Sequence, residues 1–595
     1  MEDRMGSVFN VQGANEFNNF ISNLGLVEVQ LEGYSFTLSH PSATKMSKLD
    51  RFLVTEGLVS LFPHISGICL DRHLSDHRPI LLREVITDYG ATPFRMYHSW
   101  FSLHSFEQMV MHTWNSIVLD DRNWMVHSKK KMHFLKKEIR VWVMDQKQKQ
   151  SGRIKEIKSK LSDIDKLLDQ GGVNIEILLS RMDLLKQMQD IKSSDAHDCM
   201  HKAKIQWAIE GDENSMFFHG IINRKHANLA IKGVIVDDLC VAVEWFFDHS
   251  SFTKGCNSSF IALISKTHDP KFVSDYRPIS LIGSLYKVVT KILAIRLSMV
   301  IFDLISDVQT AFLPNREILD GLFIINELLS WCKHKKQQAM VFRVDFAKAY
   351  DSIRWDYLDD VVRSFGFGSK WCSWIGGSLI SGMTSILING SPTSEFQFNC
   401  GLKQGDPLAP YLFILIMESL YFSFSRAVDA GIFTGIKIDS SLTISHLFYA
   451  YDAVFISEWY NANLTSITHI LHCFSLLSSL KINLKKSHLL GVGTSNDTIT
   501  ATALNLGCSV MKTPFKYLGM VGGNSSTIKS RDDTIGKLKA RLSNWKLKTL
   551  SIGGRLMLLK LVLGSTPIYN MSLYKVPKSV LHSMESIRRN FFNGI

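Results

Sequence analysis

The chain has 595 residues, enough for three or four domains of ~100–200 residues each, so several separate cores are expected. A hydrophobic share of 46% and a charged share of 21% are typical of globular proteins and exclude both a disordered chain and a chain built of membrane spans. Lysine and arginine exceed aspartate and glutamate by 67 to 55, so the net charge of +12 favours a polyanionic partner, with nucleic acid as the leading candidate.

The nine cysteines are scattered, odd in number and never spaced as C-x-x-C. This pattern suggests neither a disulfide framework nor a zinc knuckle, and it predicts a reducing compartment. The first residues, MEDRMGSVFNVQGANEF, contain no apolar run after a basic segment, so no secretory signal is predicted. They resemble the middle of a domain rather than its start.

Residues 1–90 alternate short apolar runs with turn-rich gaps, which is typical of strands in a mixed α/β or sandwich layer. Residues 91–240 are a basic helical linker: between positions 126 and 160 there are twelve lysines or arginines against three acids. Apolar residues such as Ile157, Leu161 and Ile164 then recur at helical spacing, which predicts an amphipathic helix. This basic helix has two interpretations, a solvated face or an arm that contacts nucleic acid, and the sequence does not choose between them.

Residues 241–525 show a dense alternation of strands and helices, and residues 526–595 contain basic helical stretches interrupted by Gly553 and Gly554. Within the α/β region, the segment AMVFRVDFAKAYDSIRWDYL places Asp345 directly after an apolar strand-like run. A carboxylate at a strand end is where two-metal phosphoryl-transfer sites keep their ligands, although an aspartate there is more often a helix cap.

Two further segments carry the same chemistry. The segment ISHLFYAYDAVFIS sets a tyrosine and an aspartate between two apolar runs, which predicts a β-hairpin. Between these two segments lies NCGLKQGDPLAPYLFILIMESL, where Gly401, Gly405 and Pro407 predict a turn that lets the backbone approach a ligand.

These three segments, in this order and spacing, resemble motifs A, B and C of reverse transcriptases. Upstream, FIALISKTHDPKFVSDYRPISLIGSLYKVVTKILAIRL and SDVQTAFLPNREILDG resemble the finger motifs of non-LTR (LINE-type) retrotransposons, especially the plant lineage, and downstream LKINLKKSHLLGVG and TPFKYLG resemble motifs D and E. The resemblance is close from about residue 260 to 519. It implies a right-hand polymerase with fingers and palm over 241–525 and a partial, thumb-like region over 526–595.

The family resemblance also implies a function. Such a protein is an RNA-directed DNA polymerase that extends a DNA 3′ end, with an RNA template, a DNA primer, dNTPs and two Mg²⁺ ions as partners. The resemblance places it in the nucleus and cytoplasm, with no membrane association, and leaves its oligomeric state open.

Residue by residue, the resemblance makes Asp345 a ligand of both Mg²⁺ ions. Tyr350 would stack under the incoming sugar and exclude a 2′-hydroxyl. Gln404 and Gly405 would line the pocket for template and nucleotide, whereas Asp351 is expected to cap or pair locally and to hold no metal.

The same resemblance assigns basic residues to the triphosphate. Arg277 and Lys266 would pair with its oxygens, and Lys486 would lie near the leaving pyrophosphate. The primer grip would be formed by a short run after the palm: Tyr517, Leu518 and Gly519.

Motif C departs from the family pattern, which is Tyr-Ala-Asp-Asp. Here the sequence is Tyr449, Ala450, Tyr451 and Asp452, so a neutral tyrosine stands where the first metal-binding aspartate is expected. Removing that charge predicts a loss of at least ~10³-fold in rate. Asp345 and Asp452 would remain as the metal-site acids, but Asp452 is not expected to substitute for position 451, because neighbouring strand residues point to opposite faces.

Near the N-terminus, KMSKLDRFLV and CLDRHLSDHRPILLRE resemble the C-terminal part of the endonuclease/exonuclease/phosphatase fold that precedes the polymerase in LINE-type elements. By this resemblance His77 would act on the scissile phosphate, Asp50 would orient its imidazole, and Asp76 would lie beside the metal. Residues 1–90 would be a truncated α/β-sandwich remnant without nicking activity, because the earlier half of the fold is missing.

Two other gaps suggest a decaying element. The linker passes from Val236 to the finger segment almost at once, as if a piece had been deleted, and no zinc-binding or RNase H segment appears before Ile595. Two alternatives to an active polymerase remain: a catalytically dead remnant that only binds RNA, and a group II intron maturase, which the Ser-Asp-His segment near the N-terminus counts against.

Overall fold

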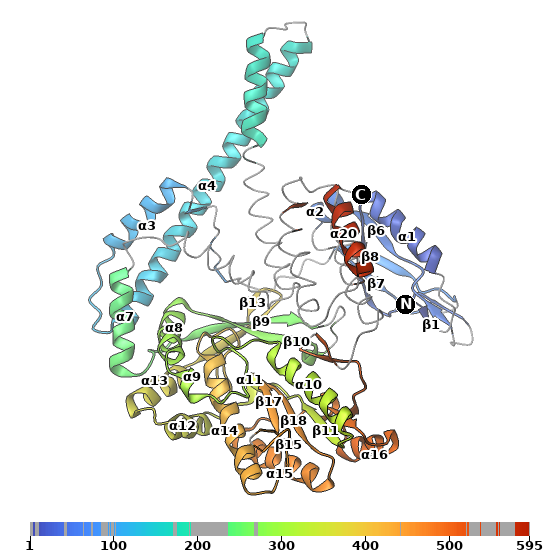
Figure 1. Cartoon of the computed structure of the whole chain (residues 1–595). Helices are drawn as coiled ribbons and strands as arrows, with labels where there is room; N and C mark the ends of the chain where they lie inside the picture. The colour runs from blue at the N-terminus through green and yellow to red at the C-terminus, as the bar shows by residue number, and fades with distance from the viewer. Residues whose placement is uncertain are drawn as a thin grey trace. The chain divides into compact units, whose positions relative to one another are not determined.

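The chain is described by a computed structural model (Figure 1). The described residues are 4–5, 11–40, 45–62, 65–72, 75–84, 93–94, 96, 100–101, 103–169, 175–189, 191, 236–266, 270, 272–440, 442–518, 520–522, 536, 555–556, 559 and 578–593. The chain forms two compact units, Met1–Ala91 and Thr92–Ile595.

The N-terminal unit is a mixture of short strands and helices. Two of its strands, β2 (Leu26–Val29) and β6 (Phe52–Thr55), form an antiparallel pair, and β3 (Leu31–Gly33), β7 (Ile65–Cys69) and β8 (Ile80–Glu84) form a three-stranded sheet. A third small sheet has the order β1 (Arg4–Met5), β5 (Met46–Ser47) and β4 (Leu38–Ser39). The helices of the unit are α1 (Val11–Leu24) and α2 (Glu56–Leu61).

The second unit begins with long helices. The predicted amphipathic helix is part of α4 (Trp124–Asp169), which packs against α3 (His104–Ser116) through an aromatic cluster that includes Phe106 and Trp114. Ile157 and Leu161 are buried, as their spacing predicted. Helix α7 (Val236–His249) packs against α4 and leads into the α/β region.

The first sheet of the α/β region contains β9 (Ser258–Ser265), β10 (Tyr276–Ile282) and β12 (Met383–Ile388). Strand β9 is central: it runs antiparallel to β10 and parallel to β12, and β12 also pairs with β13 (Ser391–Pro392) and β14 (Phe396–Gln397). Helix α8 (Ser284–Ser298) follows β10 and buries Tyr286, Val289 and Leu293 in the main core.

The second sheet carries the predicted carboxylates. Its strand order is β17 (His446–Tyr449), β18 (Asp452–Glu458), β11 (Ala339–Val344), β19 (His488–Val492) and β20 (Ser509–Val510). Strand β11 is central and antiparallel to both of its neighbours. Both of its faces are buried, which explains why its sequence is an almost continuous apolar run instead of an alternating one.

The two faces of this sheet belong to two cores. Phe342 and Val344 contact the main core, which includes the long helix α14 (Ala409–Asp429), whereas Val341 contacts a second core built with α10 (Asp320–Lys335) and the hairpin β21 (Phe515–Tyr517) and β22 (Met520–Gly522). Among the described residues, α14 is the one helix long and apolar enough to cross a membrane. More than half of its apolar window is buried within the protein, as in a core helix.

Of the expected thumb-like region, the longest described element is α20 (Lys578–Asn593). Gly553 and Gly554, which were expected to interrupt its helices, lie outside the described residues.

Candidate active site

The carboxylates of Asp345 and Asp452 approach each other at one end of the second sheet. Val344 of β11 is opposite Ala453 of β18, so continuing the same register places Asp345 opposite Asp452. Residues directly opposite on antiparallel strands lie side by side on one face. Burial raises the pKa of the Asp345 carboxyl; Lys486 lowers it and Asp452 raises it, as expected if all three groups lie near one another.

The backbone around Asp345 is fixed by the segment after α15 (Asn461–Ser478). The Asp345 N–H donates to the Ser487 hydroxyl over 3.2 Å, and its carbonyl accepts from the Asn483 N–H over 2.7 Å. Among the described residues, no hydrogen-bond donor contacts its carboxylate oxygens. The side chain is therefore held in place through its backbone and leaves its oxygens available.

Tyr451 lies in the turn of the predicted hairpin. Tyr449 pairs with Asp452, so Ala450 and Tyr451 form a two-residue loop, and Ala450 has a positive φ of 50°. The Tyr451 side chain is 39% exposed. Burial raises the pKa of its phenol, Asp452 raises it further and Arg277 lowers it, so the ring lies beside charges of both signs.

Asp452 is bound to a neighbouring cation. Its Oδ1 accepts from the Arg343 guanidinium over 2.8 Å, and the Asp452 residue is 8% exposed. The same guanidinium lies 5.5 Å from the centre of the Tyr517 ring on β21. Arg343 therefore connects its own strand β11 with the hairpin that carries Tyr451 and with the hairpin of β21 and β22.

The residues present do not fit two Mg²⁺ ions well. Mg²⁺ prefers oxygen ligands, usually one or two carboxylates besides phosphate and water. Here one carboxylate is replaced by a phenol at Tyr451 and another, Asp452, is ion-paired with Arg343. Among the described residues, no three His, Cys, Asp or Glu side chains form a metal-binding group.

The turn of the middle segment packs against α11 (Ala349–Ser352) and the residue after it, which follow Asp345 in the chain. The Leu402 N–H donates to the Tyr350 carbonyl over 2.6 Å, and the Gly401 N–H donates to the Ile353 carbonyl over 2.8 Å. Gly401 has a φ of 83°, and a Cβ there would lie 2.7 Å from the Asp351 carbonyl oxygen. The glycine is therefore required by close contact with the chain's own backbone, whereas the approach of this turn to a ligand stays a prediction.

Gln404 and Gly405 lie against the first sheet. The Gln404 carbonyl accepts from the Ser280 N–H of β10 over 2.8 Å, and Gly405 has a φ of 107°. Behind them, Lys403 and Asp406 are both buried: the Lys403 ammonium donates to Asn257 over 2.7 Å, and the Tyr286 hydroxyl donates to Asp406 over 2.6 Å. Burial lowers the pKa of Lys403 to about 8.

Tyr350 is half-buried and packs against the main core. Its ring stacks on Phe413 of α14, with centroids 4.8 Å apart and planes 22° apart. Burial raises the pKa of its phenol, and the nearby Tyr451 raises it further. Tyr350 and Tyr451 are therefore neighbours in the same site.

The predicted phosphate-binding residues lie on or beside β10 and β9. Arg277 is on β10, and its charge acts on the phenol of Tyr451. The Lys266 ammonium donates to the Ser274 carbonyl over 2.9 Å, and its charge lowers the pKa of Asp351, which burial raises. Asp351 also receives the influence of Lys348, in keeping with the local role expected for it.

The predicted primer grip is part of the second core. Tyr517 is 2% exposed and its ring lies under Arg343, so it packs and presents no ring to a primer. Leu518 has a φ of 50° in the turn of the hairpin. Gly519 lies outside the described residues.

In the N-terminal unit, Asp50 and His77 are in contact. Asp50 Oδ2 lies 2.9 Å from His77 Nδ1, and the Thr37 hydroxyl accepts from the Asp50 N–H over 2.9 Å. Hydrogen bonds from His77 and Thr37 hold the pKa of Asp50 below its usual value although burial opposes this, and the bond to Asp50 raises the pKa of His77. Asp76 is exposed, and its carbonyl accepts from the Ser39 N–H.

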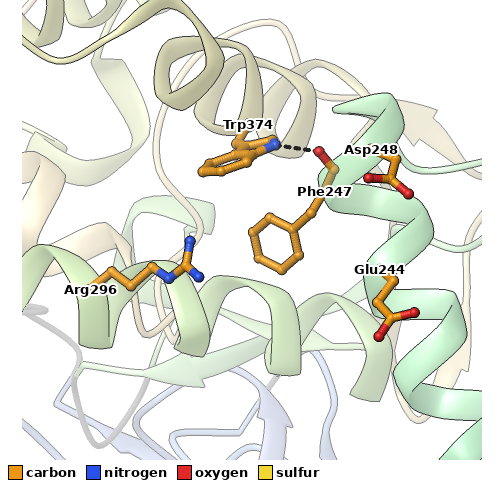
Figure 2. Close-up of a pocket in the computed structure, with 5 residues that line it drawn as sticks. All are labelled: Glu244, Phe247, Asp248, Arg296 and Trp374. Carbon is orange, nitrogen blue, oxygen red and sulfur yellow. Dashed lines mark hydrogen bonds between the residues drawn. The ribbon is translucent and has the colours of Figure 1, made fainter.

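A hollow of about 390 Å³ lies elsewhere in the second unit (Figure 2). It is lined by residues of α7, α8 and α13 (Ser369–Ile380): Glu244, Phe247, Asp248, Arg296 and Trp374. The Trp374 indole N–H donates to the Phe247 carbonyl over 2.8 Å. None of the predicted site residues lines this hollow.

Sequence reasoning did not identify Arg343, Gln309 or Lys403 as parts of the site. Arg343 could have been found, because a charge inside the apolar run VFRVD, two residues before Asp345, shares its face and needs a partner. No local pattern in the sequence singles out Lys403 or Gln309. The groups that they contact, the Asn257 side chain and the Ala450 N–H, are more than a hundred residues away in the sequence.

Residues 264–521 match the family described as "Reverse transcriptase (RNA-dependent DNA polymerase)". This part of the chain is a reverse transcriptase domain, as the motifs predicted. It contains every predicted polymerase residue. It also contains the two-residue turn with Tyr451, which joins β17 to β18.

The similar proteins come from mobile elements and from a plant. The "Transposon TX1 uncharacterized 149 kDa protein" of Xenopus laevis is 25% identical over 54% of this chain and 25% of its own length. The "Retrovirus-related Pol polyprotein from type-2 retrotransposable element R2DM" of Drosophila melanogaster is 27% identical over 55% of this chain and 31% of its own length. An uncharacterized mitochondrial protein of Arabidopsis thaliana is 45% identical over 11% of this chain and 56% of its own length.

The chain thus spans a quarter to a third of the two retrotransposon proteins. The expectation of a reverse transcriptase domain related to non-LTR retrotransposon polyproteins is confirmed. The plant lineage and the nuclease remnant remain predictions.

Proposed function

We propose that this chain is the reverse transcriptase of a LINE-type retrotransposon, of plant lineage, in a copy whose catalysis is impaired by Tyr451. The polymerase would join a dNTP to a DNA 3′ end on an RNA template. The observation that carries this proposal is the pair Asp345 and Asp452 at the end of β11 and β18, inside the reverse transcriptase match, with Tyr451 in the adjoining turn.

Electrostatics explain the impairment. In nucleotidyl transfer the charge on the transferred phosphate is stabilised by fixed cations, and carboxylates at the site hold those cations. Tyr451 offers a neutral phenol, and its pKa is raised, so it carries no charge near pH 7. Asp452 cannot make up the difference, because Arg343 already neutralises it.

Other residues of the site support nucleotide binding. Arg277 and Lys266 would meet the triphosphate, and Lys486, whose charge acts on Asp345, would lie near the pyrophosphate. Gln404 and Gly405 lie where the middle turn meets β10, between the two sheets. The residues 1–90 would be a nuclease remnant that cannot nick, although Asp50 still orients His77.

Primer extension tests the proposal. The full chain and its Tyr451→Asp variant are compared on an RNA template with a DNA primer, dNTPs and Mg²⁺. We expect extension by the variant at a rate at least ~10³-fold above that of the unchanged chain, because the lost charge returns beside Asp345. Asp345→Asn in the Tyr451→Asp background is the matched control, and it should abolish the gain.

Activity of the unchanged chain equal to that of the Tyr451→Asp variant would refute the impairment. A silent variant would favour the second candidate, an RNA-binding remnant, if the chain still retained RNA with an affinity that falls steeply with salt. The basic surface of α4 favours this candidate, because exposed cations such as Lys137 and Arg140 on that helix can neutralise phosphates.

A further inference from the structure

The hairpin that carries Tyr451 is flanked by residues 308–310, which belong to the segment SDVQTAFLPNREILDG. The Thr310 N–H donates to the Phe448 carbonyl over 3.0 Å, and the Phe448 N–H donates to the Val308 carbonyl over 2.8 Å. Residues 308–310 thereby extend the edge of the sheet beyond β17. Gln309, in the middle of this segment, is fully buried.

The Gln309 side chain holds the turn of the hairpin. Its Oε1 accepts from the Ala450 N–H over 2.9 Å and from the Ala311 N–H over 3.1 Å. Ala450 is 4% exposed and has a positive φ, a conformation that a residue with a Cβ adopts only when its surroundings impose it. The Gln309 amide is therefore the side-chain contact that fixes the backbone one residue before Tyr451.

The role of the Gln309 amide lies in its oxygen. Its Nε2 is buried and has no hydrogen-bond partner among the described residues. Its Oε1 is the side-chain acceptor of two buried N–H groups, those of Ala311 and Ala450. A methionine of similar size would remove the unpaired donor but would leave both N–H groups without this acceptor.

We infer that Gln309 is a positioning residue of the active site: through the Ala450 N–H it fixes the Ala450–Tyr451 turn and thereby the position of side chain 451 relative to Asp345. The contact itself is independent of the proposed function. Its effect on nucleotide transfer rests on that function, because only a side chain that takes part in the reaction gains from being held in place.

The contact can be observed in the full chain as it stands. The dipeptide Tyr-Ala occurs once in the sequence, at positions 449 and 450. Labelling tyrosine carbonyls with ¹³C and alanine nitrogens with ¹⁵N therefore selects one NMR signal, the Ala450 N–H. Gln309→Met should speed hydrogen exchange at this amide by at least ~10-fold, since the acceptor is lost.

Three variants separate positioning from general loosening. Thr310→Val removes a neighbouring hydroxyl of the same segment and should leave the Ala450 signal unchanged. Gln309→Glu keeps an Oε1 acceptor and should restore slow exchange. Gln309→Asn, one methylene shorter, should fail to reach Ala450 and repeats the test if the methionine variant does not fold.

The kinetic consequence is measured in the Tyr451→Asp background. Adding Gln309→Met should lower kcat by about 10–100-fold and leave the KM for dNTP unchanged, because a displacement of about 1 Å affects the reaction more than binding. Unchanged exchange at Ala450 would overturn the inferred contact, and faster exchange with an unchanged kcat would overturn the positioning role. If the Tyr451→Asp chain is inactive, the proposed function fails, and the exchange measurement still decides whether Gln309 holds the turn.

Discussion

Tyr451 and Asp452 are adjacent in the chain but differ in their surroundings: Tyr451 lies in a turn, and Asp452 is ion-paired with Arg343. From the sequence, Asp452 is not expected to replace the missing carboxylate at position 451, because adjacent strand residues point to opposite faces. In the structure Tyr451 lies in a turn, so strand alternation does not apply to it. We infer a different reason why Asp452 cannot replace a carboxylate at position 451. The Arg343 guanidinium binds the Asp452 carboxylate over 2.8 Å.

The Asp50 and His77 pair allows a prediction at the scale of single residues. Asp50→Asn should lower the pKa of His77 towards that of a free imidazole, because the hydrogen bond that the His77 ring donates to the Asp50 carboxylate is the main cause that raises it. The full chain is labelled with ¹³C-histidine, and the NMR signal of His77 is identified as the one that is absent in His77→Gln. The chemical shift of this signal is then followed with pH to give the pKa of His77.

The sign of the stability effect follows from the raised pKa. The pair stabilises the folded unit most between the folded pKa values of its two members: the contribution is lost as the pH rises through the folded pKa of His77 and as the pH falls through the folded pKa of Asp50. A His77 titration that Asp50→Asn leaves unchanged would show that the contact does not form in solution.

At the scale of elements, α14 holds a buried acid against the segment before Gln309. Glu418 is 1% exposed and accepts from the Ser306 N–H and hydroxyl over 3.0 and 3.1 Å. Burial raises its pKa to about 7, and the nearby Arg316 lowers it. The folded protein therefore binds this proton more tightly than the unfolded chain does.

Replacement of Glu418 should change how stability depends on pH. Because the folded pKa is the higher one, the contribution of Glu418 is greatest below the unfolded pKa and is lost as the pH rises through about 7. This lowers the free energy of unfolding of the unchanged chain by roughly 3 kcal/mol between pH 4 and pH 8. The free energy of unfolding of Glu418→Gln lacks this decrease, so relative to the unchanged chain it should rise by about that much over the same range. Urea unfolding at pH 4 and pH 8 measures the free energy of unfolding of both proteins. The same change between the two pH values in both proteins would contradict the prediction.

Elements with a strong local pattern could be predicted from the sequence. The runs around Asp345 and around Tyr451 are strands because they are apolar and β-branched, and the hairpin between Tyr449 and Asp452 follows from the short gap between two such runs. The contacts of Gln309 with Ala450 and of Lys403 with Asn257 could not be predicted, because each joins residues more than a hundred positions apart. Only the folded chain brings them together.

At the scale of the whole molecule, the reverse transcriptase domain carries both sheets, the buried α14 and the close backbone contact at Gly401. The long basic helix α4 is partly neutralised by its own acids, as in the pairs Lys149 with Asp145 and Lys160 with Glu156. We therefore propose that the cause of impaired catalysis is Tyr451 at the site and not a loss of the fold.

Binding of Mn²⁺, a paramagnetic substitute for Mg²⁺, tests that claim most directly, because it needs neither primer nor template. Electron paramagnetic resonance on the full chain would compare the unchanged protein with Tyr451→Asp, and with Tyr451→Asp combined with Asp345→Asn as the matched control. We expect Tyr451→Asp to bind Mn²⁺ at least ~10-fold more tightly than the unchanged chain, because the substitution returns a negative charge beside Asp345. Adding Asp345→Asn should remove this gain in affinity. Equal affinity of the unchanged chain and the Tyr451→Asp variant would contradict it.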